Sequence, residues 1–160
     1  MKKILFCLIL GLFLMGCVSA ANLPDFAMVD GFNDTGDGIF LKYDSNKKVE
    51  QTFFILEYNV HDAGDYLLND TEYGYTVFNS TNNTFNFVDE KLKEKGCIEL
   101  IEFEGKRYIV ESWNDITGND HDFTDTFNNL MQFNKLNNIT PLNATEIIEK
   151  ELLNQTNSTK

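Results

Sequence analysis

The sequence predicts an α+β protein, in which an antiparallel β-sheet of about 5–7 strands has a C-terminal amphipathic helix packed on one face and is preceded by a signal-peptide helix. Three observations predict this class. Short apolar runs divided by turn-rich loops fill residues 26–113, and Glu104-Gly105 marks a tight hairpin turn. From residue 122 onward, apolar residues recur at helical spacing.

The N-terminal segment has the features of an export signal. Lys2 and Lys3 precede an apolar run over residues 4–15, and small residues follow it. The run is shorter than the roughly 20 apolar residues that a membrane-spanning helix needs. We therefore expect residues 1–20 to be a signal peptide, and the rest of the chain to be secreted or held at the cell surface.

Three ways of processing this segment stay open. Cleavage after Ala20 suits the small residues there and would leave Ala21 as the first residue. The stretch Leu14-Met15-Gly16-Cys17 resembles a bacterial lipobox, in which Cys17 would carry a lipid. An uncleaved anchor is the third alternative. All three place residues 22–160 outside the membrane.

The composition limits the partners of the chain. Its 160 residues include 25 acidic and 13 basic side chains, a formal charge of −12, and loss of the two lysines in residues 1–20 makes it −14. A protein that binds nucleic acid or an anionic membrane surface needs clusters of basic side chains, so we expect neither kind of binding. Contact with a membrane would come only through the signal segment or a lipid at Cys17. Cleavage after Ala20 would also remove Cys7 and Cys17, which leaves Cys97 as the single cysteine. We therefore expect Cys97 to be a small apolar strand residue, without an intramolecular disulfide.

Apolar runs between turn residues predict the first strands. Two hairpins are expected, one around residues 33–38 and one around the polar loop 79–83. Thr52–Val60 is predicted as a single strand, because alternate residues place one apolar set on one face. A short helix is expected at residues 90–95, before Gly96. The hairpin strands are Phe26–Phe32 with Ile39–Tyr43, and Tyr73–Phe78 with Thr84–Val88.

The clearest unit is the hairpin Cys97–Trp113. Gly105 accepts the positive φ that a two-residue turn needs, and the strands then pair with Glu102 opposite Arg107. A one-residue slip would put Glu102 opposite Lys106, so charge alone does not fix the register. Both faces carry apolar residues, which is typical of strands that are central or covered on both sides.

The C-terminal part changes to helical spacing. Asp122 resembles a helix start, and Asn137-Asn138 with Pro141 ends the helix. Its apolar residues are Phe123, Phe127, Leu130 and Met131, with Phe133 and Leu136 near the seam. Asn143 is expected to cap a second, short helix. The expected organisation is a signal peptide (1–20), one α+β domain (21–141), and a short helix with a polar, sequon-rich tail (142–160).

Asparagine is the most informative residue type. Random placement of the 19 Asn and 18 Ser or Thr would give Asn-x-Ser/Thr about twice, whereas it occurs eight times. The excess predicts N-glycosylation on accessible loops or tails, and chance combined with Asn and Thr turn chemistry is the alternative. The predicted sites are Asn33, Asn69, Asn79, Asn82, Asn138, Asn143, Asn154 and Asn157. Pro141 directly follows the sequon at Asn138, which commonly impairs transfer.

The signal, the sequons and the acidic, Asn-rich composition together resemble small exported surface proteins of methanogenic archaea. These proteins are largely uncharacterised, so the resemblance implies a place at the cell surface and no chemistry. A late hairpin followed by an amphipathic helix is similar to small PsbP/Mog1-type domains. This second similarity concerns the fold, which does not imply function.

Two acidic loops are candidate metal sites. Residues 33–38 partly match the spacing of a calcium loop, although they also suit a plain hairpin turn. Residues 115–122 could bind Ca²⁺ weakly, or His121 could join His61 at a zinc site; a solvated loop before a helix is the alternative. The candidate metal ligands are Asp34, Asp37, Asp115, Asp120 and Asp122.

The sequence contains no nucleophile elbow, phosphate loop or dinucleotide motif. We therefore expect a non-catalytic, exported cell-surface or envelope protein with an extracellular or envelope partner and no cofactor. The alternative is a small extracytoplasmic module that binds a ligand, a sugar or calcium, with Trp113, Tyr66, Tyr73 and Tyr75 available to stack on a sugar. A hydrolase that uses His61 or His121 is the third hypothesis.

Overall fold

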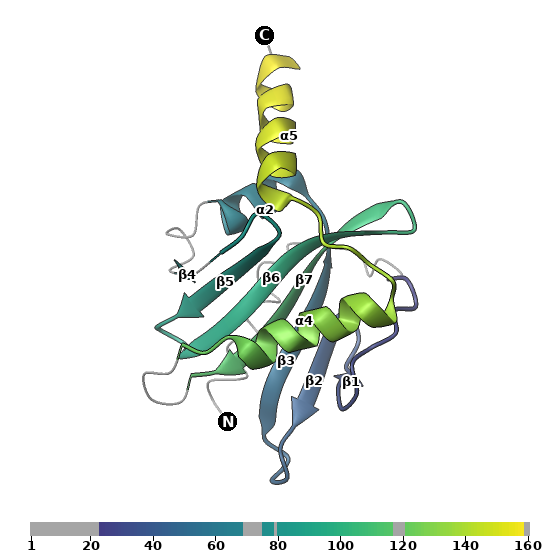
Figure 1. Cartoon of the computed structure of the whole chain (residues 1–160), viewed down its shortest axis with the longest axis vertical. Coiled ribbons are helices and arrows are strands. Elements are labelled where there is room, and N and C mark those ends of the chain that lie inside the picture. The colour runs from purple at the N-terminus through teal and green to yellow at the C-terminus, as the bar shows by residue number, and fades with distance from the viewer. Residues whose placement is uncertain (1–22, 69–74, 79, 117–120, 159–160) are drawn as a thin grey trace.

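The computed structural model describes residues 23–68, 75–78, 80–116 and 121–158, which form a seven-stranded antiparallel sheet and three helices (Figure 1). The strands are β1 (Asn33–Asp34), β2 (Ile39–Tyr43), β3 (Val49–Glu57), β4 (Thr76–Phe78), β5 (Thr84–Asp89), β6 (Glu94–Phe103) and β7 (Lys106–Asp115). The helices are α2 (Val60–Leu67), α4 (Thr124–Leu136) and α5 (Ala144–Ser158). The α+β class and the antiparallel sheet are confirmed, and the predicted signal peptide lies outside the described residues.

The predicted central hairpin is confirmed, together with its register. The strands lie in the order β1-β2-β3-β7-β6-β5-β4, which makes β7 the middle strand. β6 pairs with β7 so that Glu102 lies opposite Arg107. The turn residues Glu104 and Gly105 both have positive φ, 51° and 77°, and such a turn matches the right-handed twist of the strands. Turn geometry therefore fixes the register that charge left open.

Helix α4 covers one face of the sheet (Figure 1). Leu130 and Phe133 of α4 are completely buried there, against Phe53 of β3 and Ile101 of β6. Phe133 also lies 5.1 Å from Phe53, ring centre to ring centre. Helix α4 is therefore anchored to the three central strands by a compact aromatic and aliphatic core.

The exposed and buried faces of α4 differ from the expectation. Three residues that were predicted to belong to the apolar face or its seam are instead exposed: Phe127 at 40%, Met131 at 50% and Leu136 at 54%. Three polar residues are buried in their place: Thr126, Asn129 and Asn134. These polar side chains find hydrogen-bond partners in the sheet, so their burial leaves most donors satisfied.

The predicted strand Phe26–Phe32 is wrong. Only the two residues of β1 pair with β2, because the chain turns at Gly31, where φ is 88°. Phe26 and Val29 nevertheless enter the core on the α4 side of the sheet. The apolar pattern of this segment therefore reflects burial without strand pairing.

Helices α2 and α5 cover the opposite face of the sheet, so helices pack on both faces rather than on one. The strand that was predicted to reach Val60 ends at Glu57, because helix α2 begins at Val60. Asn59 caps α2: its side-chain oxygen accepts a hydrogen bond from the backbone N–H of His61 at 2.9 Å. Ala63 and Leu67 then point into the core.

Helix α5 joins the domain through its first half and projects from it through its second (Figure 1). Ala144 and Ile148 are completely buried. A Cβ atom at Gly64 of α2 would lie only 3.0 Å from Leu152 Cδ1, so this glycine allows the two helices to approach closely. The helix continues to Ser158 and thus includes residues that were predicted to form a polar tail.

A polar network ties α5 to the edge of the central hairpin. Glu151 of α5 forms an ion pair with Arg107 at the start of β7, and it accepts a hydrogen bond from the Tyr58 hydroxyl at 2.8 Å. Arg107 also lies over the Tyr58 ring, 5.8 Å from its centre. The network fixes the direction in which α5 leaves the sheet.

The close contact between Gly96 and Trp113 yields the first prediction. A Cβ atom at Gly96 would lie 2.5 Å from Trp113 Cδ2, across the β6–β7 ladder. Gly96→Ala is expected to lower the free energy of unfolding by about 1–3 kcal/mol through overpacking, as measured by chemical denaturation. In a Trp113→Leu background the same substitution should cost clearly less, and an equal cost in both backgrounds would contradict the steric explanation.

Candidate functional site

The first acidic loop forms the β1–β2 turn. Asp34 accepts a hydrogen bond from the backbone N–H of Gly36 at 2.7 Å, and Asp37 is exposed with a φ of 54°. Thr35 bonds to the carbonyl of Ile39 through both its N–H and its hydroxyl. Asp34 therefore shapes this turn through its carboxylate, and Asp37 through its left-handed backbone conformation.

The second acidic loop is described only at its two ends. Asp115 ends β7 and lies 3.2 Å from the Lys48 ammonium. Asp122 precedes α4 and accepts hydrogen bonds from the Thr124 hydroxyl and backbone N–H, which lower the pKa of this carboxyl group. Asp120 lies outside the described residues. Within the ranges that the structure describes, no three His, Cys, Asp or Glu side chains gather as a set of metal ligands.

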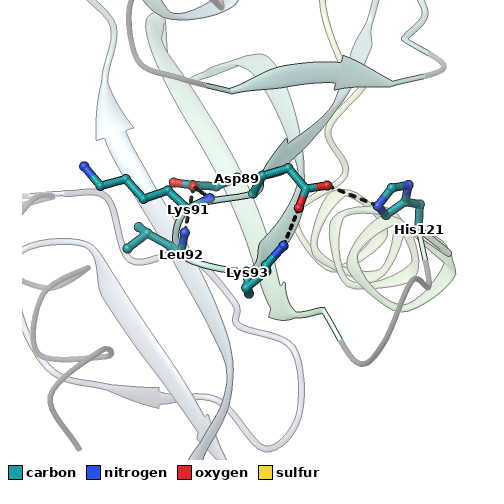
Figure 2. Close-up of polar contacts among 6 residues, drawn as sticks. Asp89, Lys91, Leu92, Lys93 and His121 are labelled. Carbon is teal, nitrogen blue, oxygen red and sulfur yellow. Dashed lines mark hydrogen bonds and ion pairs between the residues drawn. The ribbon is translucent and has the colours of Figure 1, made fainter.

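A polar turn between β5 and β6 meets this loop (Figure 2). The Asp89 carboxylate accepts hydrogen bonds from the backbone N–H groups of Lys91 and Leu92, both at 2.8 Å. The helix predicted at residues 90–95 is therefore wrong, because the aspartate closes a turn and β6 begins at Glu94. Glu90, the residue after Asp89, then lies close to His121.

Glu90 connects this turn to His121. Its carboxylate accepts a hydrogen bond from the Lys93 ammonium at 2.6 Å and lies 3.6 Å from His121 Nε2. The hydrogen bond from Lys93 lowers the pKa of Glu90. The His121 ring also packs edge-on against Phe78, 5.0 Å between centres. His121 thus belongs to a surface contact on the α4 side, whereas His61 lies on α2 at the other face of the sheet, so the structure does not bring the two histidines together.

Of the aromatic residues that were considered as a sugar platform, Trp113 is buried, and Tyr66 and Tyr75 are half-buried against the core. Trp113 is only 7% exposed and lies against Gly96, and Tyr66 stacks on Phe87 at 5.7 Å. Tyr75 packs against both Tyr66 and Trp113. Tyr73 lies outside the described residues. These side chains therefore serve the core between the sheet and α2.

A buried carboxylate lies at the centre of this aromatic cluster. Glu111 of β7 accepts hydrogen bonds from Trp113 Nε1 at 2.7 Å and from the Tyr66 hydroxyl at 3.1 Å. Burial raises the pKa of Glu111 to about 7, although both hydrogen bonds act in the opposite direction. Glu111 was not among the residues predicted from the sequence to form a site. A charged residue two positions from Ile109 and two from Trp113 in an alternating strand was the available signal.

A second buried carboxylate lies on the α4 side. Glu99 of β6 accepts hydrogen bonds from Asn134 of α4 at 2.7 Å and from Thr84 of β5 at 2.8 Å, and burial raises its pKa. Cys97 is buried nearby as predicted, with its sulfur 3.2 Å from the Thr126 hydroxyl, and burial raises the pKa of the thiol to about 11. A thiol with such a pKa is a poor nucleophile at neutral pH.

The predicted glycosylation sites that the structure describes lie at the surface. Asn33, Asn82, Asn138, Asn154 and Asn157 are exposed, and Asn143 is half-buried. Asn69 and Asn79 lie outside the described residues. Their side chains differ in one respect that matters for modification. Within the described part of the chain, the amides of Asn82, Asn154 and Asn157 have no hydrogen-bond partner, whereas those of Asn33 and Asn143 are engaged.

An open groove of about 420 Å³ lies along the outer side of α5. It begins at Asn82 in the loop between β4 and β5 and follows one stripe of the helix. The lining residues are Asn82, Asn143, Thr145, Glu146, Glu149, Lys150, Leu153 and Asn154. Three of them are sequon asparagines from separate places in the sequence, and the groove was not predicted. We call it the α5 groove.

Comparisons of the chain with protein-family models, with curated proteins and with solved structures gave no match. Within the described ranges, no helix combines the length and the apolar character that crossing a membrane requires. The function must therefore be argued from the chain's own residues.

Glu111 yields a prediction of pH dependence. Because its pKa is near 7 when folded and near 4.5 when unfolded, the folded state binds the proton more tightly between these values. The free energy of unfolding should therefore fall as the pH rises from 4.5 to 7, by up to about 3 kcal/mol from this group, and stay level above.

Glu111→Gln tests this expectation, since glutamine keeps a hydrogen-bond acceptor for Tyr66 and Trp113 without a titrating group. Denaturant unfolding at several pH values should show a flatter profile for this variant than for the wild-type protein. The exposed residue Glu50 provides the control, because Glu50→Gln removes a charge without changing the core. If the free energy of unfolding of Glu111→Gln still falls with pH as steeply as that of the wild-type protein, Glu111 is not the cause of the pH dependence.

Proposed function

We propose that the chain is an exported, N-glycosylated protein of the cell surface or envelope, which acts without catalysis. One observation carries the proposal: all six sequon asparagines in the described residues reach the surface, and five of them are exposed. Enzymatic glycosylation needs such access, because the acceptor amide has to enter the active site of a transferase. The fourfold excess of sequons over chance, eight against about two, supports the same conclusion.

Export is supported by the basic start, the apolar run and the small residues within residues 1–20. Cleavage after Ala20 would release a chain of charge −14, which suits a soluble or surface-held glycoprotein better than a nucleic-acid binder. The lipidated and anchored alternatives lead to the same side of the membrane, so the proposal is the same for all three.

The absence of catalysis is supported by where the unusual acids lie. Raised carboxyl pKa values are typical of catalytic acids, but also of buried structural groups. Glu111 is 5% exposed and Glu99 is 1% exposed, and neighbouring side chains donate hydrogen bonds to one oxygen of Glu111 and to both oxygens of Glu99. A substrate cannot approach carboxylates that are enclosed in this way, so we assign both to the packing of helices against the sheet.

Side-chain contacts predict which sequons are used. The Asn33 amide donates to the carbonyls of Gly31 and Leu41, and the Asn143 amide donates to the Glu146 carboxylate at 3.3 Å. Attachment of a sugar replaces an amide hydrogen and adds bulk, so it competes with these contacts. The amides of Asn82, Asn154 and Asn157 have no such contact among the described residues.

We therefore predict high glycan occupancy at Asn82, Asn154 and Asn157, and low occupancy at Asn33 and Asn143. Mass spectrometry of glycopeptides from chain produced in its native host, or in a related glycosylating host, gives the occupancy of each site. Asn82→Gln should remove one glycan from the intact mass, whereas Asn33→Gln, the matched control, should leave the glycan mass unchanged. Occupied Asn33 and Asn143 beside an empty Asn82 would contradict the ranking, and a bare peptide mass would contradict the proposed function.

A further inference from the structure

We propose that the α5 groove binds the chain's own carbohydrate: the glycan attached at Asn82 lies along α5 from its first turn to Leu153 and supports the start of the projecting half. The inference rests on the proposed function, because it requires glycosylation. It goes further in assigning one glycan to one surface. The groove provides the space, about 420 Å³, and the sequon at its foot provides the attachment point.

Two hydrogen bonds, one between backbone groups and one from a side-chain amide, place Asn82 at the base of the helix. The carbonyl of Asn82 accepts a hydrogen bond from the backbone N–H of Ala144, the first residue of α5, at 3.0 Å. The neighbouring Asn83 amide donates to the carbonyl of Pro141, also at 3.0 Å. The loop between β4 and β5 is thus pinned to the start of α5. The Asn82 side chain stays exposed and, within the described residues, without a partner.

The lining of the groove suits a saccharide. Sugars present hydroxyl groups along their edges and C–H groups on their faces, so they bind best to mixed surfaces. Glu146, Glu149 and Lys150 supply charged acceptors and donors for hydroxyl groups, and Leu153, which is 63% exposed, supplies an apolar contact. Glu146, Glu149, Lys150 and Leu153 fall at intervals of three and four residues, so they form one continuous stripe of the helix.

The second half of α5 is the part of the helix that needs such support. Ala144 and Ile148 are completely buried in the core, but residues 153–158 are all exposed. A helix that projects into solvent with few tertiary contacts opens readily, because most helical stability in proteins comes from packing. A glycan that leaves Asn82 and follows the stripe would add contacts to the part of α5 that the sheet does not reach.

Hydrogen exchange of the α5 backbone amides tests the proposal in the full mature glycoprotein. Asn82→Gln removes the glycan but keeps the backbone carbonyl that pins the loop. It should reduce the protection of amides in residues 149–153 by about threefold or more. Asn154→Gln, which removes the other groove-lining sequon that we expect to be occupied, and Asn157→Gln, which removes a sequon outside the groove, should both leave these amides unchanged. In protein made without glycosylation, Asn82→Gln should have no effect.

A double-mutant cycle tests the contact itself. Leu153→Ala should reduce the protection in the glycosylated protein, and it should add little once Asn82→Gln has removed the glycan. A glycan on Asn82 whose removal leaves α5 protection unchanged would overturn this inference and leave the proposed function intact. Glycans at other sequons with none at Asn82 would do the same. A chain without any glycan would overturn both.

Discussion

The β6–β7 hairpin is the constraint on which the rest of the structure depends, because both of its faces are buried. Ile98 and Leu100 are completely buried on one side of β6, and Cys97 and Ile101 on the other. A hairpin with two apolar faces is unstable unless both are covered, because each uncovered face would expose a large apolar area to solvent. Helices must therefore cover the sheet on both sides, α4 on one and α2 with α5 on the other.

This double cover explains why carboxylates are found in the core. Glu99 and Glu111 lie on opposite faces of the same hairpin, and each is held by a side chain of the covering helix, Asn134 of α4 and Tyr66 of α2. Burial raises the pKa of each, and hydrogen bonds from the helices offset part of that cost. Because the interior is occupied in this way, interactions with other molecules fall to the outer surface, where the sequons and the α5 groove lie.

Much of the sheet could be predicted from the sequence, because local rules decide it. Gly105 and the alternation around it predicted the hairpin and its register. Helix α2 was not predicted, because Val60 continues the apolar alternation of the preceding strand. The signal for the helix was Asn59, whose side chain caps its first turn. The buried polar face of α4 and the α5 groove depend on partners distant in sequence, such as Glu99 for Asn134, and no local pattern contains that information.

The most direct test of the account is the intact mass of the native protein, measured in both the membrane fraction and the medium. We expect a chain that begins at Ala21, at a lipidated Cys17 or, where the signal is an uncleaved anchor, at Met1, and that in each case carries additional mass in sugar increments. A mass equal to that of the bare polypeptide from Met1 would contradict it, because neither export processing nor glycosylation would then have taken place.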